Sequence, residues 1–174
     1  LMAFVVLLYI AGHETTVNLI GNGTLALLNN PEQQAIVHNN GLAQSHIDEL
    51  LRFDGPVQHT VRVPLVPVHY MVDNEQITVQ PGTMVLTSLG GANHDPSMFL
   101  YPNDLQLNRP NSNRHMAFAS GIHYCLGASL AKLETEIAVG SLIKRFAQIE
   151  IIGTPSWRDR LTIRGVNQLR LSVS

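Results

Sequence analysis

The distribution of apolar positions along the chain predicts a mainly α-helical protein. Residues 2–29 form one long apolar stretch with a polar cluster near its middle, and the Asn-Asn-Pro that follows ends this helix and begins the next. Shorter helices are predicted for residues 31–37 and 45–53, and a longer one for residues 128–146. These four segments hold most of the predicted regular structure.

Two details of these helices follow from residue types. Ser45 stands where the N-cap of the third helix is expected, with Asp48 three residues later in the position of a capping-box acid. On the helix 128–146, apolar residues that recur at helical spacing are expected to face the core. They are Leu130, Leu133, Ile137, Leu142 and Ile143.

From residue 59 the apolar period changes to two and β-branched residues become frequent, which predicts short strands and enough of them for a small sheet. The predicted strands are residues 60–63, 66–72, 76–79 and 83–89. Residues 90–117 are rich in Gly, Asn, Asp and Pro and are expected to be irregular. The tail from residue 149 alternates weakly, so short strands are expected there. The fold class predicted is mainly α with a small β-sheet.

Composition narrows the classes of partner. Apolar residues make up 45% of the 174 residues and charged residues 14%, which is typical of a core-forming globular chain. The net charge of −2 gives no electrostatic reason to expect nucleic acid or an anionic membrane surface as a partner. A single cysteine excludes an intrachain disulfide and favours a cytoplasmic location.

The first residues look like the interior of a helix. The apolar run 2–11 is shorter than the roughly 20 residues that a membrane-spanning helix needs, and it lacks the basic region and cleavage site of a secretory signal. We therefore expect no membrane partner. The chain opens on Leu1 with Met2 second, and our interpretation is that an N-terminal part of the protein is missing.

The only cysteine lies in the segment FASGIHYCLG, residues 118–127, directly before the predicted helix 128–146. At this place Cys125 feels the positive end of the helix dipole, which favours the thiolate that a metal ligand requires. On composition alone, a small buried thiol is the more ordinary interpretation. The segment, however, matches F-x-x-G-x-H-x-C-x-G at all five fixed positions, and it resembles the haem-binding loop of the cytochrome P-450 family.

This resemblance implies a cofactor and a set of contacts to it. The cofactor is haem b (iron protoporphyrin IX), with Cys125 as the axial thiolate and metal ligand. Phe118 is expected near the sulfur, His123 is expected to be directed at a haem propionate, and Gly127 allows the backbone to approach closely. Ala119 stands where the family often has glycine.

A second motif lies inside the first predicted helix. Residues 11–16, AGHETT, place small residues and hydroxyls at i, i+4 on one helix face. Taken alone, the hexapeptide is better explained as a solvated polar patch. It resembles the family's oxygen-activation motif, [AG]-G-x-[DE]-T-[TS]. The resemblance assigns Thr15 a hydrogen bond to the oxygen undergoing activation, and Glu14 the delivery of protons.

Two further resemblances involve arginines. Glu49 and Arg52 share a helix face at i, i+3, a spacing that is common on exposed surfaces. The resemblance makes them the family's E-x-x-R pair, buried, joined by Arg109 and structural in role. In residues 59–62, HTVR, Arg62 resembles a strand arginine that binds a haem propionate, and a surface arginine is an almost equally good interpretation.

The four motifs occur in the order that the family shows. The resemblance implies that residues 1–174 are the C-terminal haem-binding portion of a single cytochrome P-450 domain, with the long central helix, the E-x-x-R helix, the haem-ligand loop and the following helix. It implies a bacterial, soluble monooxygenase that inserts one oxygen atom from O2 into a small apolar organic substrate, with electrons from a ferredoxin or flavodoxin-type donor. The alternative is a truncated, non-catalytic haem-binding or interaction fragment.

Overall fold

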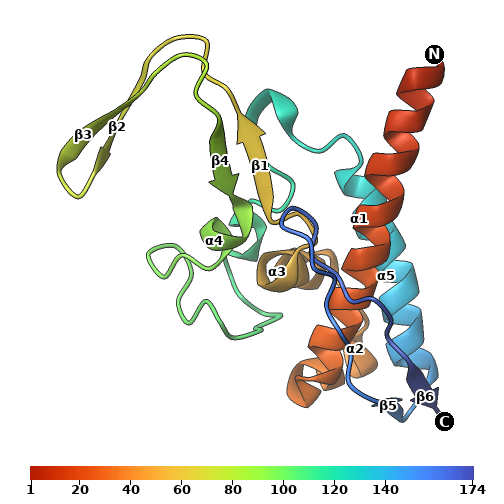
Figure 1. The fold of residues 1–174 in the computed structure, drawn as a ribbon. Helices are drawn as coiled ribbons and strands as arrows, with labels where there is room; N and C mark the ends of the chain where they lie inside the picture. Colours follow the sequence, from red (N-terminus) through yellow and green to blue (C-terminus); the bar gives the residue numbers. More distant parts are fainter.

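The computed structural model describes all residues 1–174, and it confirms the mainly helical class. Four helices account for most of the regular structure: α1 (Met2–Leu28), α2 (Pro31–Asn40), α3 (Gln44–Asp54) and α5 (Ala128–Arg145). Their bounds lie within three residues of the predicted ones. Figure 1 shows α1 and α5 side by side, with α2 and α3 packed against their lower parts.

The core lies where the C-terminal half of α1 meets α2, α3 and α5. Its most deeply buried apolar side chains are Leu19, Leu27, Val37, Ile47, Leu50, Leu51, Leu107, Val139 and Ile143, each at most 1% exposed. The first 13 residues of the chain, by contrast, are all exposed. The long central helix is therefore a core element over its second half only.

By length and composition, α1 is also long and apolar enough to cross a membrane. The mean hydropathy of its most apolar 18-residue window is 1.5, and 17% of that window is buried. A core helix passes the same test, and the burial of most residues from Thr16 to Leu27 against other helices is the behaviour of a core helix.

The predicted N-cap of α3 was wrong. The helix begins at Gln44, one residue earlier than predicted, and Ala43 is its N-cap. The ring of His46 takes the capping role, since its Nδ1 accepts a hydrogen bond from the amide of Ala43 at 3.1 Å. Ser45 and Asp48 are both two positions too far along the helix to cap it.

The buried face of α5 also differs from the predicted apolar stripe. Ile143 is fully buried as predicted, but the other buried positions of this face are Val139 and Thr135, whose hydroxyl donates to Ala131 O at 2.7 Å. The helix has apolar residues on two faces, and contact with α1, α2 and α3 selects the one that is buried. The predicted core residues that are exposed are Leu130 (59%), Leu133 (49%) and Ile137 (59%).

The four predicted strands exist, but they do not form one sheet. β1 (His59–Arg62) pairs antiparallel with β4 (Val85–Ser88), while β2 (Val68–Val72) and β3 (Glu75–Val79) make a separate hairpin. Two prolines lie between β1 and β2, and a residue without an N–H cannot continue a ladder. The β2–β3 hairpin therefore projects away from the helices (Figure 1).

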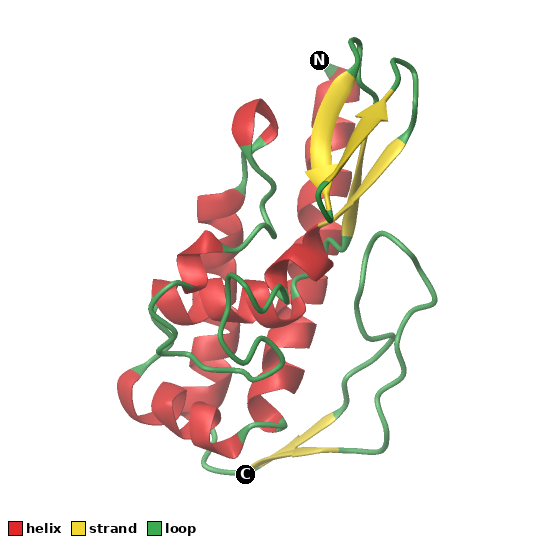
Figure 2. Ribbon diagram, turned by 90° about the vertical axis from the view of Figure 1, so that its left-hand side faces the viewer, coloured by secondary structure: helices red, strands yellow, loops and turns green.

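The remaining segments wrap around α3. The irregular stretch contains a short α-helix, α4 (Leu89–Asn93), and a short 3₁₀ helix, Ser112–Arg114, and both contact α3. The predicted tail strands are present as β5 (Ile149–Ile151) and β6 (Leu171–Val173), which pair antiparallel. The long loop between them extends away from this pair and then returns to it (Figure 2). It pairs with the segment just before β1 through an isolated antiparallel bridge between Val57 and Ile163.

Candidate functional site

A buried ionic cluster ties α3 to the irregular segment. Arg52 donates from Nε to Glu49 Oε2 at 2.7 Å and from Nη2 to Glu49 Oε1 at 2.8 Å. Arg109, which lies 60 residues away in the chain, donates from Nε to the same carboxylate at 3.0 and 3.1 Å. The side chains of Glu49 and Arg52 are fully buried, and that of Arg109 is 3% exposed. The structure thus brings together the three residues that the E-x-x-R resemblance named.

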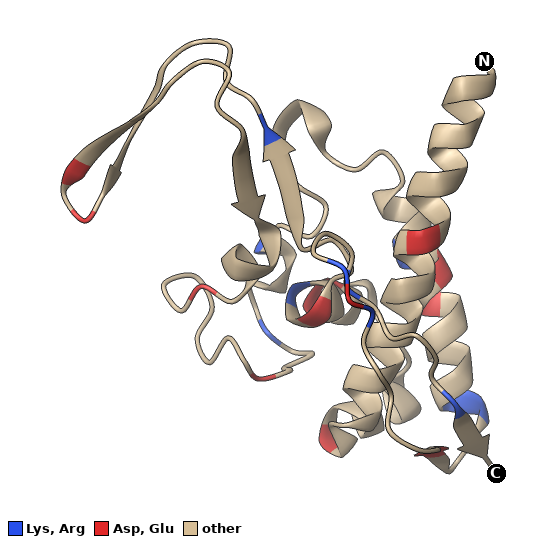
Figure 3. Ribbon diagram, in the orientation of Figure 1, with Lys and Arg blue, Asp and Glu red and all other residues tan.

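Both guanidinium groups also hold the loop backbone. Arg52 donates to the carbonyls of Asn93 and Pro102 at 3.0 and 2.8 Å, and both arginines donate to Asp104 O at 3.0 Å. Figure 3 shows acidic and basic residues next to one another on α3, in a chain with few charges. Because these N–H groups are paired, the buried charges carry little unsatisfied hydrogen-bonding capacity.

The cysteine loop is held by backbone contacts around Phe118. The amide of Cys125 donates to Phe118 O at 3.0 Å, and the Phe118 ring, 9% exposed, packs edge-on against Tyr124 with 6.2 Å between centroids. Ala119 adopts a φ of +58°, a conformation that an L side chain other than Asn or Asp rarely takes. The tight turn that glycine would make easily is therefore made here by alanine.

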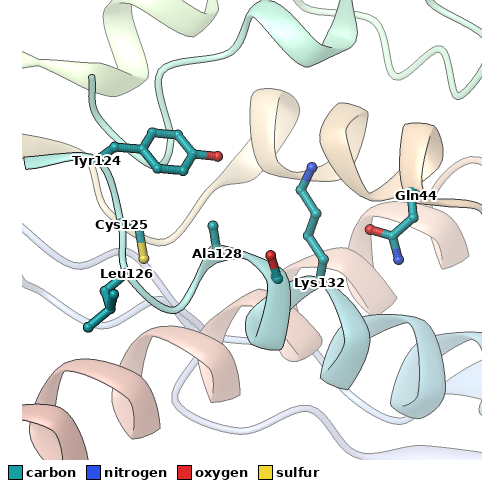
Figure 4. Close-up of a pocket in the computed structure, with 7 residues that line it drawn as sticks. Gln44, Tyr124, Cys125, Leu126, Ala128 and Lys132 are labelled. Carbon is teal, nitrogen blue, oxygen red and sulfur yellow. The ribbon is translucent and has the colours of Figure 1, made fainter. Parts of the chain in front are cut away.

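Cys125 is half-buried at the entrance to α5 and beside a cavity of about 530 Å³. Figure 4 shows the cysteine between Tyr124 and Leu126 on the loop, with Gln44 of α3 and Lys132 of α5 farther along the same cavity. Cys125 lies two residues before Gly127, which is the N-cap of the 18-residue helix α5.

The AGHETT motif lies on an unbroken stretch of α1. The hydroxyl of Thr15 donates to Ala11 O at 2.7 Å, the hydrogen bond by which a mid-helix threonine satisfies itself. Glu14 points to the loop between β5 and β6, where Arg158 Nη1 donates to its Oε1 at 3.3 Å and Arg160 donates to the same oxygen. The sequence had indicated no partner for Glu14.

At two positions of these motifs, neither the packing nor the backbone conformation of the chain requires a glycine. A Cβ added at Gly12 or at Gly127 would meet no atom within 4 Å, and neither residue has a positive φ. A glycine inside a helix costs roughly 0.5–1 kcal/mol relative to alanine, so Gly12 lowers helix stability without relieving any crowding. Open space beside α1 and beside the cysteine loop is what a large flat group bound between them would need.

The other predicted contacts to the cofactor are not assembled. Arg62 is exposed on β1, and it donates to Thr60 Oγ1 at 2.6 Å and to its neighbour's carbonyl, Val61 O, at 2.8 Å. His123 is exposed in a short 3₁₀ turn, and its ring makes no hydrogen bond with the chain. Both side chains are accessible to a ligand, but nothing in the chain holds them toward Cys125.

Sequence reasoning missed two further ion pairs, both at least partly buried. Asp48 accepts hydrogen bonds from Lys132 and from His115 Nε2, the latter at 3.2 Å, although 67 residues separate the two positions. Burial acts to raise the pKa of Asp48, but the hydrogen bonds and charges of these two partners outweigh it and leave the pKa below its ordinary value. Neither spacing nor composition signals such a pair.

The second pair joins α3 to the loop between β5 and β6. Arg164 donates from Nε to Asp54 Oδ1 at 2.7 Å, and its guanidinium lies 3.6 Å from the centroid of the Trp157 ring. Burial raises the pKa of Asp54 above its ordinary value, against the charge and hydrogen bond of Arg164 and the charge of His94.

Comparison with known proteins agrees with the motifs. The model of the cytochrome P450 family matches residues 39–154. The chain is similar to cytochrome P450 107B1 of Saccharopolyspora erythraea, with 41% identity over 97% of this chain and 42% of that protein. It is also similar to the putative cytochrome P450 140 of Mycobacterium bovis, with 38% identity over 99% of this chain and 39% of that protein.

The fold agrees as well. The structure of P450BioI in complex with an acyl carrier protein ligated to hexadec-9Z-enoic acid superposes with a TM-score of 0.90 and 37% identity, over 97% of this chain and 43% of that one. The chain spans about two fifths of the length of the relatives that it matches. Sequence motifs, family model and fold lead to one conclusion: this chain belongs to the cytochrome P450 family.

Proposed function

We propose that residues 1–174 are the C-terminal haem-binding portion of a soluble bacterial monooxygenase, which inserts one atom of O2 into an organic substrate. Membership of the family implies a haem cofactor, and we propose haem b. The observation that carries the proposal is the position of Cys125: the only thiol of the chain is half-buried at the N-terminus of α5, beside open space that the chain's own packing does not fill.

Each residue of the proposed haem site has a distinct role. Cys125 binds the iron through its thiolate, and Phe118 shields the sulfur from water. His123 and Arg62 bind the haem propionates as hydrogen-bond donors, for which a guanidinium is well suited. Gly127 leaves the space that the macrocycle occupies. The thiolate-ligated haem, when bound, supplies the activation of O2.

In this proposal, helix α1 would supply the groups that handle protons. The hydroxyl of Thr15 can exchange its hydrogen bond with Ala11 O for one with the reacting oxygen, at the cost of one intrahelical contact. Glu14 precedes it by one residue, and its Oε2 accepts no hydrogen bond from the chain, so that oxygen is available to carry a proton toward Thr15.

The substrate and electron donor are proposed more broadly. We propose a small apolar organic substrate, an electron donor of the ferredoxin or flavodoxin type, and a cytoplasmic location. Relatives carry names as different as the polyketide biosynthesis cytochrome P450 PksS of Bacillus subtilis and the vitamin D(3) 25-hydroxylase of Pseudonocardia autotrophica. These names support oxidation of an apolar organic molecule, and they do not favour one substrate.

Absorption spectroscopy of the haem-supplemented chain tests the proposal. The reduced chain exposed to carbon monoxide is expected to show the strongly red-shifted Soret band of thiolate ligation. Cys125→Ala is expected to lose this band. Ser141→Ala, a substitution of similar size at an exposed position of α5, is expected to keep it.

Other spectra would contradict parts of this proposal. A band typical of histidine ligation, or one unchanged in Cys125→Ala, would contradict the thiolate assignment. A chain that takes up no haem would support the alternative of a non-catalytic interaction fragment, and the monooxygenase activity would then describe only longer members of the family.

A further inference from the structure

The loop between β5 and β6 contains a narrow hairpin, residues 156–167, which we call the strap. Asn167 N donates to Ser156 O at 2.8 Å and Arg158 N donates to Gly165 O at 2.9 Å. Between these two hydrogen bonds, Trp157 and Val166 form an antiparallel bridge. The strap therefore has a defined backbone conformation, although it contains no named strand.

The strap lies directly on α1. The side-chain amide of Asn22 donates to Arg164 O at 3.2 Å, and a Cβ built on Gly165 would lie 2.1 Å from Asn18 Oδ1. Gly165 and Val166 are buried by this contact. So close an approach leaves no room for a side chain at position 165. The contact therefore fixes the distance between the strap and α1.

With the strap held at this distance from α1, two of its arginines reach Glu14. Arg158 and Arg160 both donate to Oε1 of the carboxylate, while Oε2 accepts no hydrogen bond from the chain. The side chains of Glu14 and Arg158 are 29% and 28% exposed, whereas that of Arg160 is 56% exposed. We call these three residues the Glu14 clamp. Arg158 is its sheltered member, and Arg160 is the one that water can replace more easily.

The clamp borders a small cavity. Arg158 and Glu14 line a space of about 310 Å³ together with Tyr9, His13 and other residues of the same face of α1. The rings of Tyr9 and His13 stack with 5.6 Å between their centroids. The carboxylate is therefore held on one side by the strap and is open on the other.

We propose that Arg158 and Arg160 are positioning residues for Glu14, and that the strap thereby sets how this acid delivers protons. This inference rests on the proposed function for the role of Glu14, but not for the existence of the clamp. Binding both guanidinium groups through one oxygen fixes the carboxylate rotamer and leaves Oε2 free. A strap that lifts from α1 would release the carboxylate and misplace that oxygen.

Trp157 makes the clamp observable without haem, since it is the only tryptophan of the chain and belongs to the strap. Glu14→Gln and Arg158→Met are each expected to shift its emission to longer wavelength and to increase quenching by acrylamide. The double variant is expected to change no more than either single one. The matched control Glu134→Gln, at an exposed position of α5, is expected to leave emission unchanged.

A steric variant tests the same contact without altering charge. Gly165→Ala is expected to lift the strap and to produce the same emission shift, with far-UV circular dichroism showing that the helices are retained. Unchanged emission in all of these variants, or fully additive effects of Glu14→Gln and Arg158→Met, would overturn the clamp.

The positioning role needs a second readout in the haem-loaded chain supplied with electrons. Arg158→Met is expected to increase the share of reducing equivalents lost as peroxide at unchanged haem content, and Arg158→Lys to restore part of the coupling. Equal coupling in all three proteins would overturn the positioning role. A chain that binds no haem would instead contradict the proposed function, and fluorescence would still decide whether the clamp exists.

Discussion

Several buried charged side chains of this molecule are paired with residues that lie far away in the chain. Glu49 accepts four hydrogen bonds from two guanidinium groups while fully excluded from water. The attraction in such a cluster is largely offset by the cost of removing the ions from water, so the intact cluster contributes little net stability. Removing one partner, however, leaves the others buried and unpaired.

We therefore expect Glu49→Gln to destabilise the chain by roughly 3–5 kcal/mol, because two buried guanidinium groups lose their only carboxylate. Urea unfolding followed by circular dichroism measures the change. Glu134→Gln removes an exposed carboxylate from α5 and is expected to stay within about 0.5 kcal/mol of the wild type. Similar midpoints for the two variants would show that the cluster is not buried as described.

His46 gives the stability a pH dependence. Burial lowers the pKa of His46 from its ordinary value of 6.5, against a weaker opposing effect of a backbone hydrogen bond at Gly41. A lowered folded-state pKa means that the neutral ring is favoured by folding. Its contribution is thus complete above pH 6.5 and is lost as the pH falls through the lower folded-state value.

Stability should accordingly fall as the pH decreases below 6.5, because protonation removes the acceptor that caps α3. His46→Gln, which keeps an acceptor but does not titrate, is expected to flatten this part of the profile of unfolding free energy against pH. His69→Gln, at an exposed position of β2, should retain the wild-type slope. A wild-type slope in His46→Gln would show that another group titrates.

At the scale of elements, the neighbours of a helix determine which of its apolar faces is buried. On α5, Ile143 is fully buried and Ile137 is 59% exposed, although both belong to the predicted stripe. The stripe was wide enough to cover two faces, and local periodicity does not distinguish between them. The contacts of α5 with α1, α2 and α3 make the choice.

The same residue type at both positions makes a direct comparison possible. Ile143→Ala is expected to destabilise the chain by roughly 2–5 kcal/mol, because it removes buried methyl groups and leaves a cavity. Ile137→Ala should change the free energy of unfolding by no more than about 0.5 kcal/mol. Chemical denaturation of both variants checks the assignment, and the reverse order would restore the stripe predicted from sequence.

For the molecule as a whole, the dominant feature is the apolar surface of the first turns of α1. Leu7 is 61% exposed and Ile10 is 60% exposed, in a run of exposed apolar side chains that starts at the first residue. Contiguous apolar surface of this kind promotes association. The chain is therefore expected to bind hydrophobic dyes and to self-associate at micromolar concentration.

Replacing Leu7 and Ile10 together by glutamine should reduce both effects, as measured by dye fluorescence and sedimentation velocity. Leu161→Gln provides the control, because Leu161 is 69% exposed but lies outside α1. If all three proteins sediment as monomers with equal dye binding, the exposed half of α1 does not drive association.

The sequence alone determined the helices, the four central strands and the motifs around Cys125, Thr15 and Glu49, because these depend on residue types and spacings over one or a few turns. It did not determine how the strands divide into sheets, which face of α5 is buried, or what holds Glu14. The arginines on Glu14 follow it by 144 and 146 residues, and no local pattern records so distant a pairing. Only the packing of the strap on α1 brings these side chains together, so the environment of the proposed proton donor was decided by tertiary structure.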